Sequence, residues 1–184
     1  MSSKSPIRVF SVDDHPLLRE GIAALVNSQP DMTLIGQGAT GAEAIQLFES
    51  WAGILPDRFF ERWCVRPVAA IVEAVRAKYP ATPIIAFPRG AGLLYDGYIQ
   101  ATGADCIGLD STVPLSWAAE KVQAGLRRCV QGNLDNRLLV AGGAAMHAEA
   151  GRILDALGKG PFIFNLGHGI LETTPPEHVD ALAR

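Results

Sequence analysis

Short apolar runs rich in β-branched residues alternate along this chain with longer stretches of helical periodicity. Such alternation is typical of βαβ units built around a parallel sheet. We therefore expect an α/β fold with a parallel sheet of about seven strands and surrounding helices. The apolar runs place these strands at about residues 7–12, 32–36, 44–50, 83–87, 106–109, 128–132 and 162–166.

Helical periodicity is clearest in three of the intervening stretches. Residues 15–28 carry apolar side chains at helical spacing and are followed by Pro30. Residues 57–79 predict a long helix with a break or bend at Pro67, because proline lacks the amide hydrogen that an internal turn needs. Residues 149–157 predict a helix that ends at Gly158 as a C-cap.

Composition narrows the class of protein. The chain has 184 residues, of which 48% are hydrophobic and 19% charged, enough to bury the core of one domain or of at most two small ones. Its formal net charge of -3 provides no basic surface for nucleic acid or for an anionic membrane. No apolar run reaches the roughly 18 residues of a membrane span. We expect a cytoplasmic protein that binds neither nucleic acid nor membrane.

The three cysteines, Cys64, Cys106 and Cys129, are widely spaced. An odd number at this spacing favours neither a disulfide framework nor a Cys-x-x-Cys metal site. We interpret them as small core residues in a reducing setting, and the sequence predicts no cofactor.

An acidic pair, Asp13 and Asp14, follows the first predicted strand. The segments IRVFSVDDHPLLREGIAALV and PDMTLIGQGATGAEAIQL, within residues 1–43, resemble a response-regulator receiver domain of the nitrate-regulator type, which has a flavodoxin-like fold. The resemblance implies that the pair is a vestigial Mg²⁺ site, since a hard cation prefers carboxylate oxygens. The structural alternative is a strand-end turn with solvated carboxylates. No aspartate ends the third predicted strand, and Asp57 is better placed to cap the next helix.

From about residue 41 onward the motifs are different and longer. They are AIQLFESWAG, PIIAFPRGAG, ATGADCIGLDSTVPL, CVQGNLDNRLLVAGG and PFIFNLGHGILETTPPEHV. Together they resemble the C-terminal part of uroporphyrinogen decarboxylase, a TIM-barrel enzyme that removes the carboxyl groups from the acetate arms of a tetrapyrrole without a cofactor. The resemblance implies that residues 44–184 form the last five barrel strands with their helices.

The resemblance also carries candidate site residues. Ser50 matches a substrate-carboxylate contact, Phe48 an apolar pocket wall and His168 the pocket histidine, while Arg89 is a base at a strand end. Each stands at or just past the C-terminal end of a predicted strand, where TIM barrels carry their sites. The structural alternatives are a turn cap for Ser50, a core position for Phe48 and a hydrogen-bonded loop position for His168.

The resemblance further implies that an aspartate, two arginines and a tyrosine of the family's site belong to an N-terminal half that this chain lacks. We therefore predict no catalytic residue and no enzyme. We interpret the chain as an engineered or recombined chimera. Its residues 1–184 are expected to form a single α/β domain whose sheet is barrel-like or partly open. An open doubly wound flavodoxin-like sheet is the alternative fold. Alternative functions are residual binding of a tetrapyrrole or other polycarboxylate, decarboxylase-like activity and, third, a phosphoacceptor. An uncovered sheet edge would also allow a homodimer.

Overall fold

The computed structural model describes residues 7–12, 24, 32–38 and 44–183, and the chain separates into two compact units, Met1–Ile45 and Gln46–Arg184. In the first unit, β1 (Ile7–Val12) and β2 (Met32–Gly38) pair in parallel, with an irregularity in register after Val9. Both strands lie where the apolar pattern predicts them. The acidic pair Asp13 and Asp14 and all of the predicted helix at 15–28 except residue 24 fall outside the described residues.

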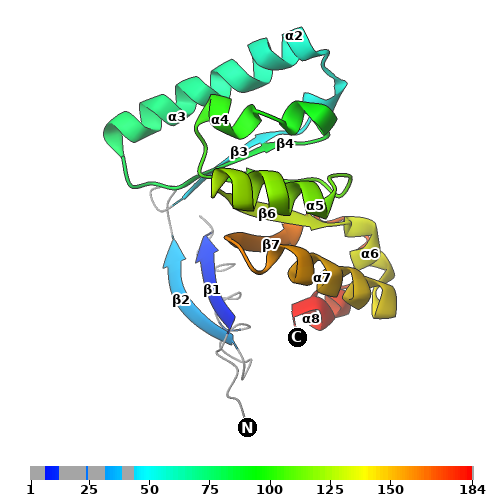
Figure 1. Cartoon of the computed structure of the whole chain (residues 1–184). Coiled ribbons are helices and arrows are strands. Elements are labelled where there is room, and N and C mark those ends of the chain that lie inside the picture. Colours follow the sequence, from blue (N-terminus) through cyan, green and yellow to red (C-terminus); the bar gives the residue numbers. More distant parts are fainter. Residues whose placement is uncertain (1–6, 13–23, 25–31, 39–43, 184) are drawn as a thin grey trace. The chain divides into compact units, whose positions relative to one another are not determined.

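A five-stranded sheet forms the centre of the second unit (Figure 1). Its strands lie side by side in chain order, and β4 to β7 pair in parallel. The parallel α/β prediction is thus confirmed, but a single sheet of seven strands is not, because the described strands form separate sheets of two and five. The strands of the larger sheet are β3 (Ile45–Glu49), β4 (Ile84–Pro88), β5 (Cys106–Gly108), β6 (Cys129–Leu134) and β7 (Phe162–Leu166).

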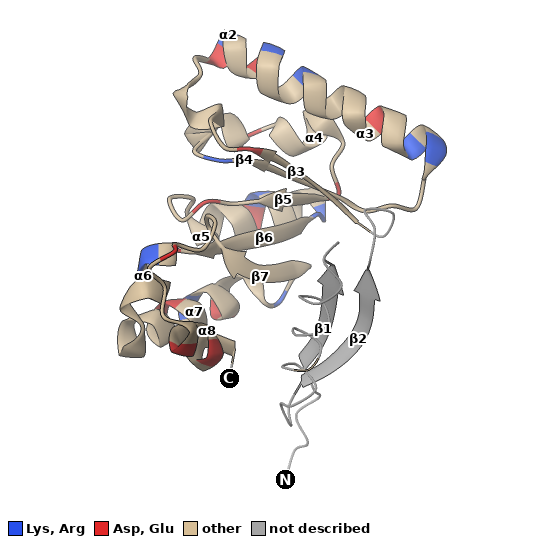
Figure 2. Ribbon diagram, turned by 180° about the vertical axis from the view of Figure 1, so that it is seen from behind, with Lys and Arg blue, Asp and Glu red and all other residues tan. Residues whose placement is uncertain are grey.

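The two faces of this sheet differ in burial. In β4 the side chains of Ile84 and Ala86 are fully buried under the helices, whereas Ile85 and Phe87, which alternate with them, are only partly buried. Because successive side chains of a strand point to opposite faces, only one face carries the helix-covered core. Figure 2 shows how little charge the strands carry, and Glu49 is their one charged residue.

The long helix after β3 changes its winding partway along. It begins as α2 (Asp57–Phe60), widens to a π-helix, η2 (Glu61–Val65), and continues as α3 (Arg66–Lys78). Pro67 is the second residue of α3, so the wide turns stand directly before it. A proline ring clashes with the carbonyl four residues earlier, and a π-type turn relieves that clash. Asp57 is the first helical residue, with Pro56 at the N-cap, so the cap interpretation of Asp57 is wrong.

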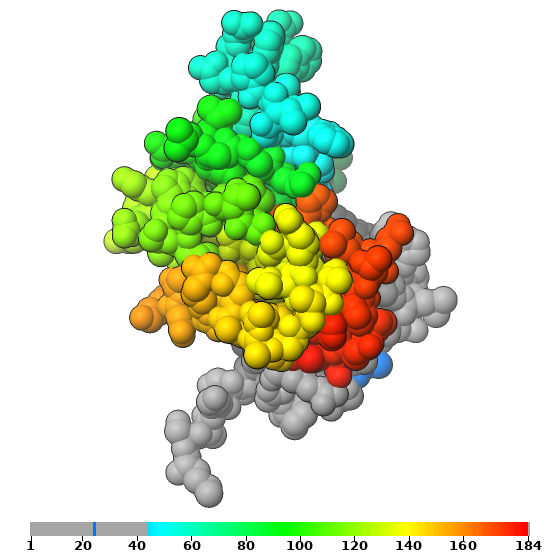
Figure 3. All heavy atoms as spheres, turned by 90° about the vertical axis from the view of Figure 1, so that its right-hand side faces the viewer, coloured from blue at the N-terminus to red at the C-terminus, as the bar shows by residue number. Residues whose placement is uncertain are grey.

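The remaining helices connect and cover the later strands. At the C-terminal end of the unit, α6, α7 and α8 pack on one another (Figure 3). The predicted helix at 149–157 begins earlier, at Gly143, and ends at Leu157 as predicted. No helix within the described ranges has the length and apolar character to cross a membrane. These elements are η1 (Ala52–Ile54), η3 (Gly92–Tyr95), α4 (Tyr98–Thr102), α5 (Leu115–Trp117), η4 (Ala118–Gly125), α6 (Asn136–Ala141), α7 (Gly143–Leu157) and α8 (Pro176–Ala183).

The central strand β5 offers a test of this packing. Ile107 is fully buried between β4 and β6, so replacing it by alanine removes buried methyl groups and leaves a cavity. We expect Ile107→Ala to lower the free energy of unfolding by about 2–5 kcal/mol, measured by chemical denaturation. Ile71→Ala on α3, where the side chain is 43% exposed, is the matched control, with an expected change within about 0.5 kcal/mol. Equal losses in the two variants would contradict this description of the core.

Candidate functional site

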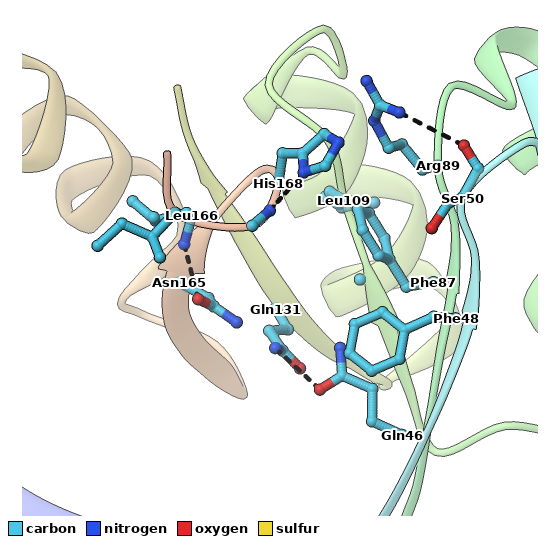
Figure 4. A pocket seen from close by; sticks show the side chains of 13 residues that line it. Gln46, Phe48, Ser50, Phe87, Arg89, Leu109, Gln131, Asn165, Leu166 and His168 are labelled. Carbon is cyan, nitrogen blue, oxygen red and sulfur yellow. Dashed lines mark hydrogen bonds between the residues drawn. The ribbon is translucent and has the colours of Figure 1, made fainter. Parts of the chain in front are cut away.

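A cavity of about 520 Å³ opens on the sheet face that the helices leave uncovered. All five strands of the larger sheet and the loop after β7 contribute to it (Figure 4). The structure therefore brings together the four residues that the motifs single out, Phe48, Ser50, Arg89 and His168. The complete lining is Gln46, Phe48, Ser50, Phe87, Arg89, Gly108, Leu109, Gln131, Asn165, Leu166, His168, Gly169 and Ile170.

Two phenylalanines form an apolar wall of the cavity. The rings of Phe48 and Phe87 meet edge to face, with centroids 6.2 Å apart. Gly108 on β5 leaves room for Phe87, because a Cβ at this glycine would lie 2.9 Å from the Phe87 side chain. Phe48 is 66% exposed, so the alternative that it is a core residue is wrong. An aromatic side chain held in the open can contact a flat apolar ligand.

Three polar residues stand where strands give way to loops. Ser50 lies in the turn after β3, and Arg89 directly follows β4. The Arg89 guanidinium donates to the Ser50 carbonyl oxygen at 3.4 Å, and the Arg89 backbone amide donates to the Glu49 carbonyl oxygen at 3.1 Å. The Nδ1 atom of His168 accepts from the Gly169 amide, which leaves the Nε2 atom as its N–H donor (Figure 4).

A neighbouring cavity of about 410 Å³ shares Ser50, Arg89 and His168 with the first. It adds Asn136 and Arg137 from the start of α6, where Asp135 caps the helix by accepting from the Arg137 amide. Sequence reasoning missed both residues, although the polar run that follows β6 could have indicated them. The three shared residues thus stand between two adjoining hollows.

A buried carboxylate organises the loops around these hollows. Asp110, which is 5% exposed, accepts hydrogen bonds from the Gly90 amide at 2.8 Å, the Thr112 amide at 2.9 Å, the Tyr95 hydroxyl at 3.1 Å and the Thr112 hydroxyl. Burial alone would raise the pKa of Asp110, but the donors from Thr112, Gly90 and Tyr95 outweigh it and lower the pKa. Asp110 is therefore an ionised, fully hydrogen-bonded group that fixes the Arg89 loop.

The loop that carries His168 packs against the segment that begins at Asp110. The Asn133 amide group donates to the backbone oxygens of Asp110 and Val113 at 3.0 and 3.1 Å. Gly167 donates its amide hydrogen to Leu134, and a Cβ at Gly167 would come within 2.4 Å of the Ser111 nitrogen. Only glycine permits so close an approach. The loops after β4, β5 and β7 are thus held together by direct contacts.

The charged residues that line the two hollows favour the binding of an anion. Their charged lining residues are Arg89, Arg137 and Asp110, and Asp110 already has its oxygens occupied. Two guanidinium groups beside a histidine and a serine hydroxyl can bind carboxylate oxygens. Within the described part of the chain, no group of three or more His, Cys, Asp or Glu residues could hold a metal ion.

Comparison with known proteins identifies relatives of nearly the whole chain. The family model described as uroporphyrinogen decarboxylase (URO-D) matches residues 23–184. Uroporphyrinogen decarboxylase of Rhodospirillum rubrum is 49% identical over 170 residues, which cover 92% of this chain and 47% of that protein. The Brucella canis protein of the same name is 46% identical over 182 residues, covering 97% and 51%. The chain spans about half the length of the curated relatives it matches.

These relatives overturn two expectations. The expectation of a scaffold without native activity is wrong, and so is the expectation that the chain is not an enzyme. Proteins that are 46–49% identical over more than nine-tenths of this chain are named uroporphyrinogen decarboxylase. The chimera is not confirmed either, since the family match begins at residue 23, inside the segment interpreted as receiver-like. The solved response regulator domain of Thermotoga maritima CheB is 19% identical with a TM-score of 0.25, over 97% of this chain and 89% of that one, and supports no inference.

Acid titration tests the role of Asp110. Its carboxyl group has a lower pKa in the folded chain than when unfolded, so its stabilisation is present above the unfolded pKa of about 3.9. That stabilisation is lost as the pH falls through the folded pKa. We expect Asp110→Asn to lower the free energy of unfolding at pH 7 by about 1–3 kcal/mol, because donors lose their acceptor.

The difference between the wild type and Asp110→Asn should shrink below about pH 4. Denaturation curves collected from pH 7 to pH 3 measure it. Asp155→Asn on the exposed face of α7 is the matched control. A difference that does not change with pH would rule out the ionised carboxylate as its source.

Proposed function

Because the chain belongs to the uroporphyrinogen decarboxylase family, we propose that its sheet-face cavity binds a tetrapyrrole with several carboxylate arms and that the chain acts in the decarboxylation of that substrate. The observation that carries the proposal is the meeting of Ser50, Arg89 and His168 beside the Phe48 and Phe87 wall in one cavity. An apolar wall with a few convergent polar groups is the usual form of a small-molecule site.

Each side chain has a chemical role in this proposal. Arg89 pairs with a carboxylate arm, to which its guanidinium can donate two parallel hydrogen bonds. The Ser50 hydroxyl donates to a carboxylate oxygen, and the Nε2–H of His168 donates to an acceptor at the same end of the cavity. Phe48 and Phe87 pack against the apolar part of a pyrrole ring. The rim residue Arg137 takes a further arm at the neighbouring hollow.

The reaction itself needs an electron sink. When an acetate arm loses carbon dioxide, the electron pair of the breaking C–C bond passes into a protonated pyrrole ring, and the remaining methylene carbon then takes up a proton. A cationic pyrrole is stabilised by an anion placed against it. The described lining offers cations and a carboxylate, Asp110, that is already saturated with donors. We propose that the described lining chiefly binds and orients the carboxylate arms.

A binding titration tests the first part of the proposal. Coproporphyrin fluorescence followed against chain concentration should give a saturable curve. Arg89→Ala should weaken binding by about tenfold or more, since a hydrogen bond to a charged group contributes about 1.5–3 kcal/mol. Arg62→Ala, at an exposed position on the outer helix, should leave the affinity unchanged. Equal affinities for both variants and the wild type would exclude Arg89 as a carboxylate contact.

An activity assay tests the second part. Uroporphyrinogen is incubated with the chain, alone and with the N-terminal half of the R. rubrum relative, and the products are separated by their number of carboxyl groups. We expect decarboxylated products above the buffer blank, formed about tenfold or more slowly by His168→Ala, because a hydrogen-bond donor that orients the substrate is lost. His147→Ala on the exposed face of α7 is the control. Wild-type rates for His168→Ala would remove that histidine from the proposed site.

A further inference from the structure

Two of the three cysteines face each other across neighbouring strands. In the register of β5 with β6, Cys106 pairs directly with Cys129. Paired residues of adjacent strands point to the same face, and adjacent strands lie about 4.8 Å apart. A disulfide spans Cα separations of about 4.4–6.8 Å. The backbone therefore already places these cysteines within bonding range, although they are present as free thiols.

The two thiols are not equivalent. Cys106 is 4% exposed, whereas Cys129 is half-buried. A hydrogen bond between the two thiols, together with burial, raises the pKa of Cys106, and the same hydrogen bond lowers the pKa of Cys129 despite its partial burial. Cys129 is thus the more easily deprotonated of the two thiols, and in its protonated form it donates to the Val130 carbonyl oxygen at 3.7 Å. Thiolate character combined with exposure is what makes a cysteine reactive.

The surrounding charges hold this pair in place. The carboxylate of Asp105, next to Cys106, accepts from the guanidinium of Arg76 at 2.8 Å and from the amide of Ile84 at 2.9 Å. Arg128, next to Cys129, approaches the same carboxylate at 3.5 Å. The Cys129 amide donates to the Asp105 carbonyl oxygen at 3.2 Å. The thiols therefore lie at the anchored N-terminal ends of their strands, opposite the strand ends that carry the cavity.

We propose that Cys106 and Cys129 form a modification site at which a peroxide converts two thiols into a cross-strand disulfide. The Cys129 thiolate attacks hydrogen peroxide, forming an S–O bond as the O–O bond breaks, and the released hydroxide takes a proton to become water. Cys106 then attacks the sulfur of this sulfenic acid, forming the S–S bond as the S–O bond breaks. The second hydroxide leaves as water with the Cys106 proton. Two thiols and one peroxide thus give one disulfide and two waters.

Cys64 provides the contrast within the same chain. It lies in η2, is 1% exposed, and has its pKa raised to about 11 by burial and by the charge of Glu49. The interpretation of the cysteines as small core residues fits Cys64. It also fits the buried Cys106 but not the half-buried Cys129. The adjacency of Cys106 and Cys129 depends on strand register, so the spacing of the sequence does not reveal it.

The test uses the full chain and hydrogen peroxide as the probe. After treatment with one equivalent, the protein is denatured, its free thiols are alkylated and counted, and its peptides are mapped by mass spectrometry without reductant. We expect the count to fall from three thiols to one, the remaining thiol to be Cys64, and a cross-linked peptide to join Cys106 and Cys129. A reductant such as dithiothreitol should restore all three.

Two variants sharpen the outcome. Cys64→Ser should keep the disulfide and leave no free thiol, and Cys106→Ser should instead accumulate a sulfenic acid at Cys129, detected with a dimedone reagent. Both variants are first checked for a wild-type circular dichroism spectrum, and a misfolded variant is replaced by the corresponding alanine variant. The proposal is overturned if the wild type keeps three thiols, forms only intermolecular disulfides, or oxidises Cys129 to sulfinic acid without a cross-link.

Discussion

The buried carboxylate of Asp110 is the constraint on which the rest of the site depends. A charged group out of water is costly unless donors surround it, and here they come from the loop after β4, from η3 and from the residues after Asp110 itself. Satisfying the carboxylate therefore fixes the loop that carries Arg89. The backbone oxygen of Asp110 adds a bond from Asn133, which brings β6 into the same arrangement. The close approach of Gly167 to the Ser111 backbone then places His168 in the lining of the cavity that also contains Arg89.

The uncovered face of the sheet explains why this site is both aromatic and open. Phe48 and Ile163 are 66% and 42% exposed on strands whose alternate residues pack against the core. Such exposure is costly unless a ligand or a protein surface covers it. Among the described strands, β3 and β7 each have one neighbour, so a homodimer through a sheet edge stays a prediction.

Much of the fold could be predicted from local pattern. Strand β7 has the predicted bounds, and β4 is shifted by one residue. Strand positions are predictable because a short apolar run is a property of neighbouring residues in the sequence. The π-helical turns before Pro67 could be predicted only as a bend, since their form depends on how the proline clash is relieved. Asp110 and the sheet cysteines could not be predicted at all. Apart from Thr112, which is close to Asp110 in sequence, their partners are 15 to 23 residues away, and the fold brings them close.

In the candidate site, the residues that are present are a better guide to function than the residues that are missing. Ser50, Arg89 and His168 come from three segments of the chain, yet one cavity holds them all. That convergence depends on a sheet in chain order, with these three residues just past the C-terminal ends of their strands. The expectation of an inactive scaffold instead depended on groups that the motifs do not contain. An argument from missing groups says which steps the described lining cannot perform by itself, whereas the strand-end residues that are present support the proposed binding of carboxylates.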